Sequence, residues 1–219
     1  TTKDVMTTSF NTILDFDISI LQKLNLDFDI KSSSVLDLGE GEAAVYKGMR
    51  RDHKRRLKKA ESSGFKPIID DNFQYIDEYY ELLKSTYSRL GNEKLVDKEF
   101  YRLCCSQLPD GWIRLFMVKN RDDFIAGGLV LVHKKSVIFW RGVALDEFMR
   151  LGSSRLLYWT IIQWAIKKGY QTMDVLHNPT DSLYHFKQGF GCVLQSSYSV
   201  TKKSRKWNYL QRFRKIFSK

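Results

Sequence analysis

The stretch WIRLFMVKNRDDFIAGGLVLVHKKSVIFWRG, residues 112–142, decides the fold expected for this chain. It contains three runs rich in β-branched, aromatic and aliphatic residues, and two short polar segments separate them. Such runs predict three consecutive strands, at residues 112–119, 124–132 and 136–142. The middle run is apolar without alternation, which indicates a strand that is buried on both faces. The stretch therefore predicts the centre of a sheet.

The residues on either side alternate between helical periodicity and short apolar runs. Helices are expected at residues 9–24, 41–63, 73–90, 100–108 with Asp97 as N-cap, 152–168 and, as a short helix or turn, 181–188. Further strands are expected at residues 33–38, 65–69, 172–176 and 192–201. This order predicts an α/β (α+β) fold with a mixed, mostly antiparallel sheet and helices on both faces. It is the order of the Gcn5-related N-acyltransferase (GNAT) fold.

Positive charge is concentrated in two short segments. The chain has 219 residues and a net charge of +11, of which residues 50–59 carry +6 and residues 202–219 carry +8, so the rest sums to −3. Such segments attract the phosphates of nucleic acids, of nucleotide-linked substrates or of anionic lipids, and they also occur as solvated helix faces without a partner. Residues 204–217 fit a basic amphipathic helix.

Several classes of protein are disfavoured by what the sequence lacks. The longest apolar run, residues 124–132, is far too short to span a membrane, and no secretory signal follows Thr1, a first residue that suggests a fragment. Three cysteines fit a reduced compartment rather than a disulfide framework. No zinc spacing, Gly-x-Ser-x-Gly elbow or Walker-type loop occurs, so no metal is expected, and hydrolase and NTPase activities are disfavoured. A cytoplasmic location is expected, with peripheral contact to the inner face of an anionic membrane.

Three motifs together resemble the FemAB-like proteins, non-ribosomal peptidyltransferases that use aminoacyl-tRNA. The family patterns are R-x-x-I-x-K-A-x-x-x-G, R-x-G-x-x-x-L-L…W-A-x-x-x-G and G-L-x-x-F-K-x-G-F-G. The matching segments here are SVLDLG (34–39) with RRLKKAESSG (55–64), RLGSSRLL (150–157) with Trp164-Ala165 and Lys168-Gly169, and LYHFKQGFG (183–191). A related group of GNAT-like acyltransferases, associated with exopolysaccharide synthesis, shares this layout.

The resemblance implies a division of the chain, because FemAB-like proteins have two GNAT-like halves and the motifs match the second. Residues 1–48 would be the tail of a truncated or reduced first half, residues 49–201 the acyltransferase domain, and residues 202–219 a basic C-terminal tail helix. The two basic segments would then flank one cleft or domain junction.

The resemblance also implies catalytic residues. The aromatic and lysine that match Phe186 and Lys187 face the aminoacyl end of the donor, where a fixed cation stabilises the negative charge that forms on the carbonyl oxygen. The alternative is a core Phe186 and a surface Lys187. Asp174 and His177 follow from the residues themselves as candidate general bases at the end of a strand, where an acidic residue also commonly caps a loop.

Substrate-binding residues are expected mainly at the start of the helix over residues 152–168. Gly152, Ser153, Ser154 and Arg155 would offer backbone N–H groups, hydroxyls and a cation to an anion. The alternative is an ordinary helix N-terminus without a ligand. Coenzyme A binding is weakened because Met149 stands where coenzyme A-dependent GNAT enzymes carry an arginine. Three further residues are expected to bind substrate through the resemblance: Tyr184, Arg55 and Arg89. Arg89 also fits a helix-ending arginine that answers the dipole, and His53 fits a core position.

Three functions remain open from the sequence. The first is aminoacyl transfer from aminoacyl-tRNA to an amine of a cell-wall precursor or glycoconjugate. The second is an N-acetyltransferase that uses acyl-coenzyme A, and the third is a non-catalytic GNAT-like module that binds RNA or an anionic membrane. Either enzyme needs a phosphate-bearing donor and an amine acceptor but no further cofactor.

Overall fold

The computed structural model describes residues 7–12, 19–24, 26–89, 91, 95–177 and 180–203. The chain forms two compact units, one of residues 34–193 and one that joins residues 1–33 to residues 194–219. The larger unit holds nearly all helices and both hydrophobic cores. It therefore contains the features that bear on function.

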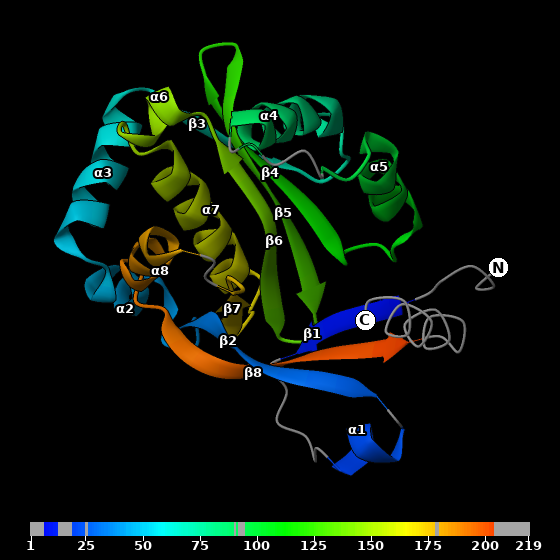
Figure 1. Ribbon diagram of the computed structural model, residues 1–219. Helices are drawn as coiled ribbons and strands as arrows, with labels where there is room; N and C mark the ends of the chain where they lie inside the picture. The colour runs from blue at the N-terminus through cyan, green and yellow to red at the C-terminus, as the bar shows by residue number, and fades with distance from the viewer. Residues whose placement is uncertain are drawn as a thin grey trace. The chain divides into compact units, whose positions relative to one another are not determined.

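The sheet of the larger unit has the strand order β2-β7-β6-β5-β4-β3. Its neighbours pair antiparallel except β6 and β7, which are parallel, as Figure 1 shows. The strands are β2 (Asp27–Asp37), β3 (Lys66–Asp70), β4 (Ile113–Asn120), β5 (Asp123–His133), β6 (Ser136–Ala144) and β7 (Thr172–Asp174). The predicted fold class is confirmed, and residues 125–130 of β5 are buried without interruption, as its apolar run predicted.

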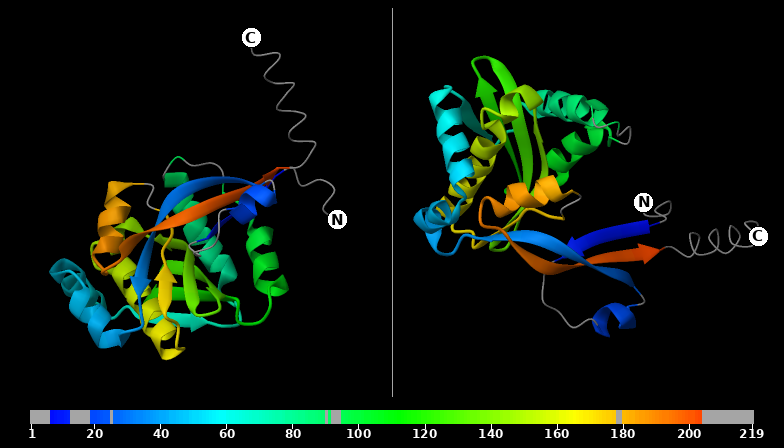
Figure 2. Two further views of the ribbon diagram at one scale, coloured as in Figure 1. Left: turned by 90° about the horizontal axis from the view of Figure 1, so that it is seen from below. Right: turned by 60° about the vertical axis from the view of Figure 1, so that its left-hand side comes forward.

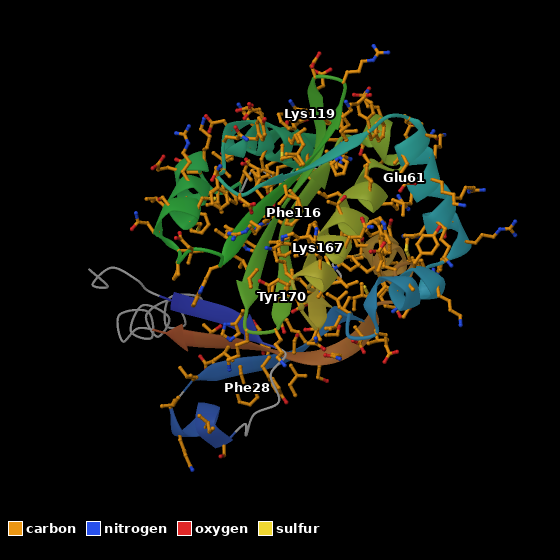
Figure 3. The ribbon with its side chains drawn as sticks, turned by 180° about the vertical axis from the view of Figure 1, so that it is seen from behind. Phe28, Glu61, Phe116, Lys119, Lys167 and Tyr170 are labelled. Atoms are coloured by element: carbon orange, nitrogen blue, oxygen red, sulfur yellow. The ribbon has the colours of Figure 1, made fainter. Side chains whose placement is uncertain are left out.

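Helices cover both faces of this sheet (Figures 1 and 2). On one face lie α2 (Gly41–Gly48), α3 (Arg51–Ser62), α6 (Asp146–Met149) and α7 (Ser153–Lys167), and on the other lie α4 (Ile76–Arg89) and α5 (Lys98–Gln107). Alternation along β4 supplies both cores. Phe116, which Figure 3 labels, packs toward α7, and its ring lies 5.2 Å from that of Trp164. Leu115 and Met117 join the core under α4.

The smaller unit contains a strand where the sequence predicted a helix. Residues 9–24 were expected to be helical, but β1 (Thr7–Thr12) pairs antiparallel with β8 (Val193–Lys203), and of the residues described in this range only those of α1 (Ser19–Lys23) form a helix. The threonines of β1 favour extended backbone because their branched Cβ restricts χ1. Residues 7–12 form a strand because they pair with β8, and no local sequence pattern predicts this pairing.

The helix expected over residues 41–63 is two helices. Met49 and Arg50 are extended, with ψ values of 142° and 149°, so α2 ends before α3 begins. The backbone N–H of Arg50 donates to the carbonyl of Gly189 at 2.9 Å instead of to its own helix. A tertiary hydrogen bond thus interrupts a continuous helical pattern, although the apolar stripe of Met49, His53 and Leu57 is buried as expected.

The remaining elements follow the sequence closely. Asp97 caps α5 by accepting from the N–H of Glu99 at 3.2 Å, and α8 (Asp181–Gln188) forms where a short helix was expected. The predicted tail helix over residues 204–217 lies outside the described residues. Within the described part of the chain, no helix has the length and apolarity needed to cross a membrane.

Candidate active site

The sheet opens between β6 and β7. These strands pair only from Ser136↔Thr172 to Ile138↔Asp174, where β7 ends, whereas β6 continues to Ala144. A register shift against β5 follows in the same stretch of β6, since Leu129 pairs with Arg141 and Val130 with Phe139. Among the described strands, none pairs with the free edge of β6 beyond Ile138, so its backbone groups border a gap in the sheet.

A cavity of about 660 Å³ lies at this free edge. Its walls come from the second half of β6, the end of α4, the start of α3, the α6–α7 junction and α8. Phe139, Tyr158 and Phe186 form an aromatic part of the wall, with ring centroids of Tyr158 lying 4.5 Å from Phe139 and 4.9 Å from Phe186. Such a volume accommodates a small substrate or the reacting end of a larger one.

Three arginines give the cavity a basic wall: Arg50, Arg89 and Arg155. Arg89 binds Asp146 with an Nη1–Oδ2 distance of 2.8 Å. Arg155 lies over the ring of Phe186, 4.8 Å from its centroid, and within the described residues it has no carboxylate partner. Burial and the nearby Arg56 lower the pKa of Arg155, and the charge of Asp52 opposes them. An anionic group in the cavity would supply the missing compensation.

His53 lies at the cavity wall between two phenylalanine rings, 5.4 Å from Phe186 and 4.8 Å from Phe190. It is 3% exposed, and its Nδ1 lies 3.4 Å from Oδ1 of Asp52. Its Nε2 has no hydrogen-bond partner in the described part of the chain. Burial and the charge of Arg155 lower the pKa of His53, against opposing effects of Asp52 and of the Phe186 backbone. The imidazole is therefore neutral near pH 7.

Gly189 of the FKQG segment owes its identity to His53. A Cβ on Gly189 would lie 2.0 Å from Cε1 of His53, closer than any side chain permits. The carbonyl of Gly189 also accepts the hydrogen bond from Arg50. The turn after α8 is thereby joined to the start of α3, so the motif positions two walls of the cavity at once.

Lys187 and Asp174 lie together at the loop that follows β7, and neither borders the cavity. Lys187 is 4% exposed, and its Nζ donates to the carbonyls of Leu176 at 3.0 Å and His177 at 2.9 Å. Burial lowers its pKa to about 8. Asp174 is also buried and accepts from the N–H of Leu176 at 2.8 Å. Lys187 is thus not the surface residue of the alternative interpretation; both side chains hold this loop, and Phe186 reaches the cavity.

The start of α7 meets the cavity through Ser154 and Arg155. Gly152 has φ +97° at its N-cap, and a Cβ there would lie 2.1 Å from the carbonyl oxygen of Arg56, so the position needs glycine. Ser153 is fully buried. Since the first bond within the helix is Leu156 N to Gly152 O, at 2.9 Å, the N–H groups before it have no partner inside the helix. This end of α7 therefore offers donors to an anion.

The other predicted site residues are dispersed. Arg55 is exposed on α3, and Tyr184 lies half-buried on α8 beside His185; neither borders the cavity. Arg89 borders the cavity with Phe186, Ser154 and Arg155. The sequence pattern predicted a core position for His53 and gave no functional signal for Asp52 or Tyr158, because only the fold brings these residues to the cavity. Within the described residues, no group of three His, Cys, Asp or Glu side chains is arranged to hold a metal.

A sheet that opens between two parallel strands, above the N-terminus of a helix that crosses it, places this domain in the class of GNAT-like acyltransferase folds. A family model described as "Acetyltransferase (GNAT) domain" matches residues 47–188, so the chain belongs to that family. No curated protein matches the chain.

Solved structures share the fold at low sequence identity. FemX aligns with a TM-score of 0.70 at 14% identity over 83% of this chain and 67% of its own. The C-terminal domain of a putative lysylphosphatidylglycerol synthetase from Agrobacterium fabrum aligns with a TM-score of 0.65 at 14% identity, over 87% of this chain and 66% of its own. An aminoglycoside acetyltransferase from an uncultured soil metagenomic sample, in complex with sisomicin, reaches 0.50 at 13% identity, over 60% and 89%. The expected FemAB-like and GNAT-like fold is confirmed, and the chain spans about two thirds of the first two relatives.

Proposed function

We propose that this protein is an N-acyltransferase that transfers an aminoacyl or acyl group from a phosphate-bearing donor to an amine. The observation that carries the proposal is the cavity of about 660 Å³ at the free edge of β6, which meets the start of α7 and the charge of Arg155, a side chain without a carboxylate partner among the described residues. The helix start and Arg155 favour an anionic donor, and the aromatic wall suits the less polar group that is transferred.

The chemistry follows from holding the two reactants side by side. The acceptor amine attacks the donor carbonyl, and negative charge forms on its oxygen. We assign Phe186 to the wall beside the reacting group. Lys187 does not border the cavity, and we retain it as the charge-stabilising residue only for a donor whose carbonyl reaches the loop after β7: two of its three N–H groups serve Leu176 and His177, and one has no partner among the described residues. Asp174 supports the same loop.

Aminoacyl-tRNA is the donor that we favour, and the acceptor an amine of a cell-wall precursor or similar glycoconjugate. The three FemAB-like motifs and the fold shared with FemX and with a putative lysylphosphatidylglycerol synthetase domain support this choice. Arg55 and the other exposed cations of α3 would meet the phosphates of the tRNA. Arg89 would face the acceptor inside the cavity, and Tyr184 a part of the acceptor that extends beyond it. Both reactants would be met in the cytoplasm, at the inner face of the membrane when the acceptor is lipid-linked.

The test is transfer of a labelled amino acid from charged tRNA to a nucleotide-linked peptidoglycan precursor. Transfer by the wild-type protein that falls at least tenfold in Lys187→Ala supports both the activity and the role of Lys187. Equal transfer by the variant removes Lys187 from the mechanism, and no transfer with any charged tRNA refutes this donor.

Acyl-coenzyme A is the second candidate donor, favoured by the N–H groups at the start of α7 that have no partner inside the helix. Isothermal titration with coenzyme A and transfer of labelled acetyl to sisomicin separate the two donors. Micromolar binding favours coenzyme A, whereas the methionine at position 149 predicts weak binding or none. Salt-sensitive RNA binding without transfer from either donor would instead indicate a non-catalytic module.

A further inference from the structure

His53 has an environment that packing alone does not require. It borders the cavity although it is 3% exposed, and its Nε2 has no hydrogen-bond partner within the described residues. An apolar side chain of similar size would fill the same space without leaving a buried nitrogen unsatisfied. An unpaired nitrogen at a cavity wall is more readily explained by a ligand that binds it.

Asp52 selects the tautomer of the His53 imidazole that such a ligand would contact. Its Oδ1 lies 3.4 Å from Nδ1 of His53, and although burial of Asp52 opposes ionisation, the contacts with His53 and the charge of Arg155 lower its pKa. An ionised Asp52 accepts a hydrogen bond from Nδ1–H, which leaves the lone pair on Nε2. His53 is then a neutral base with its free electron pair on the nitrogen that has no partner.

The charged groups that face the cavity act on this base in opposite directions. Arg50 and Asp52 face it at the start of α3, Arg89 at the end of α4, Arg155 on α7 and His185 on α8. Burial and Arg155 lower the pKa of His53, while Asp52 and the backbone of Phe186 oppose them. The imidazole is thus free to accept a proton at the pH at which transfer would occur.

We propose that His53 is the general base that takes a proton from the acceptor amine, and that Asp52 is the residue that positions its ring. The proposal rests on the acyltransferase function proposed above. As the amine nitrogen forms its bond to the donor carbonyl carbon, one N–H proton passes to Nε2. The C–O bond of an ester donor or the C–S bond of a thioester donor breaks, and the leaving oxygen or sulfur takes the proton back from His53. Donor and acceptor alone balance the reaction.

The sequence pointed to different bases, Asp174 and His177. Asp174 is engaged with the N–H of Leu176, and the carbonyl of His177 with Lys187, at the loop after β7. Neither residue borders the cavity, whereas His53 does.

The first test is the pH dependence of kcat/KM, measured with the donor that the wild-type protein uses. His53→Gln should lower kcat/KM by about a hundredfold or more and remove the acidic limb of the profile. His133→Gln, on an exposed histidine beside a turn, is the matched control and should behave as the wild type. A His53→Gln protein that keeps both the rate and the acidic limb would overturn the proposal.

Asp52→Asn changes a half-exposed side chain, so the variant is expected to fold as the wild type does. Because Asp52 raises the pKa of His53, its removal should move the acidic limb to lower pH and reduce the rate. An unmoved limb would count against the pair. The second test is the ¹⁵N NMR spectrum of labelled histidine in wild-type protein at pH 7, where the Nδ1–H tautomer of His53 is expected and a charged or Nε2–H ring would contradict the proposal. Wild-type protein that transfers no acyl group would overturn the activity and the base together, whereas active protein indifferent to His53 would overturn the base alone.

Discussion

Gly189→Ala tests the close approach on which the site depends. The backbone of Gly189 has φ −64°, a value that alanine adopts without strain, so the effect is steric alone. The new Cβ would lie 2.0 Å from Cε1 of His53 and 2.5 Å from its Nε2. Since carbon atoms pack at about 3.5–4.0 Å, the ring must retreat by about 1.5 Å or α8 must shift. Overpacking of this kind destabilises by about 1–3 kcal/mol.

The assay is urea-induced unfolding of the wild type and the variant, followed by far-ultraviolet circular dichroism. Gly48→Ala is the matched control, because a Cβ there has no atom within 4 Å and no positive φ. This control should be unchanged or more stable by up to about 1 kcal/mol. A Gly189→Ala protein as stable as Gly48→Ala would refute the close packing.

A double-mutant cycle with His53→Ala identifies the partner in the clash. Removing the ring leaves room for the new methyl group, so Gly189→Ala should cost at least about 1 kcal/mol less in the His53→Ala background than in the wild type. Equal costs in both backgrounds, within about 0.5 kcal/mol, would mean that the methyl group meets something other than His53.

Gly152→Ala should destabilise the protein by at least about 2 kcal/mol, because it combines φ +97° with a Cβ 2.1 Å from the Arg56 carbonyl; urea unfolding measures the loss. Lys187→Met should alter how stability depends on pH. Burial lowers the pKa of Lys187 from 10.5 to about 8, so between these values the unfolded chain holds a proton that the folded chain releases. The stability of the wild type should therefore increase as the pH rises through this range. The free energy of unfolding of the wild type, relative to that of Lys187→Met, should therefore rise as the pH increases across that range. A difference that does not change with pH would count against a buried ammonium. Phe186→Leu should lower kcat/KM at temperatures well below the melting temperature of the variant, because Phe186 supports Arg155 at the cavity; an unchanged kcat/KM under those conditions would reduce Phe186 to a packing residue.

Where the sequence pattern was strong and local, its predictions held. The three central strands, the N-cap at Asp97 and the apolar stripe of His53 and Leu57 all appear in the structure. In each case the deciding interaction lies within a few residues or on one periodic face. The FemAB-like motifs also indicated a contact between distant parts of the chain, because LYHFKQGFG contains Gly189, which packs against His53 and bonds to Arg50.

Where a distant partner intervened, local pattern failed. The strand at residues 7–12 depends on pairing with β8, at the other end of the sequence. The break between α2 and α3 depends on the bond from Arg50 to the Gly189 carbonyl. Neither interaction leaves a local signature, so the predicted helices over residues 9–24 and 41–63 were wrong in extent.

The sequence by itself determined the class of fold and the family, because hydrophobic periodicity and glycine-dependent motifs are written along the chain. The tertiary structure alone decided which residues meet. In the folded protein His53, Arg155 and Phe186 border one cavity. Lys187 and Asp174 instead form hydrogen bonds with the loop after β7. The physical reason is that a site forms where strands separate and helices converge, and the distances between such elements depend on packing between residues far apart in sequence.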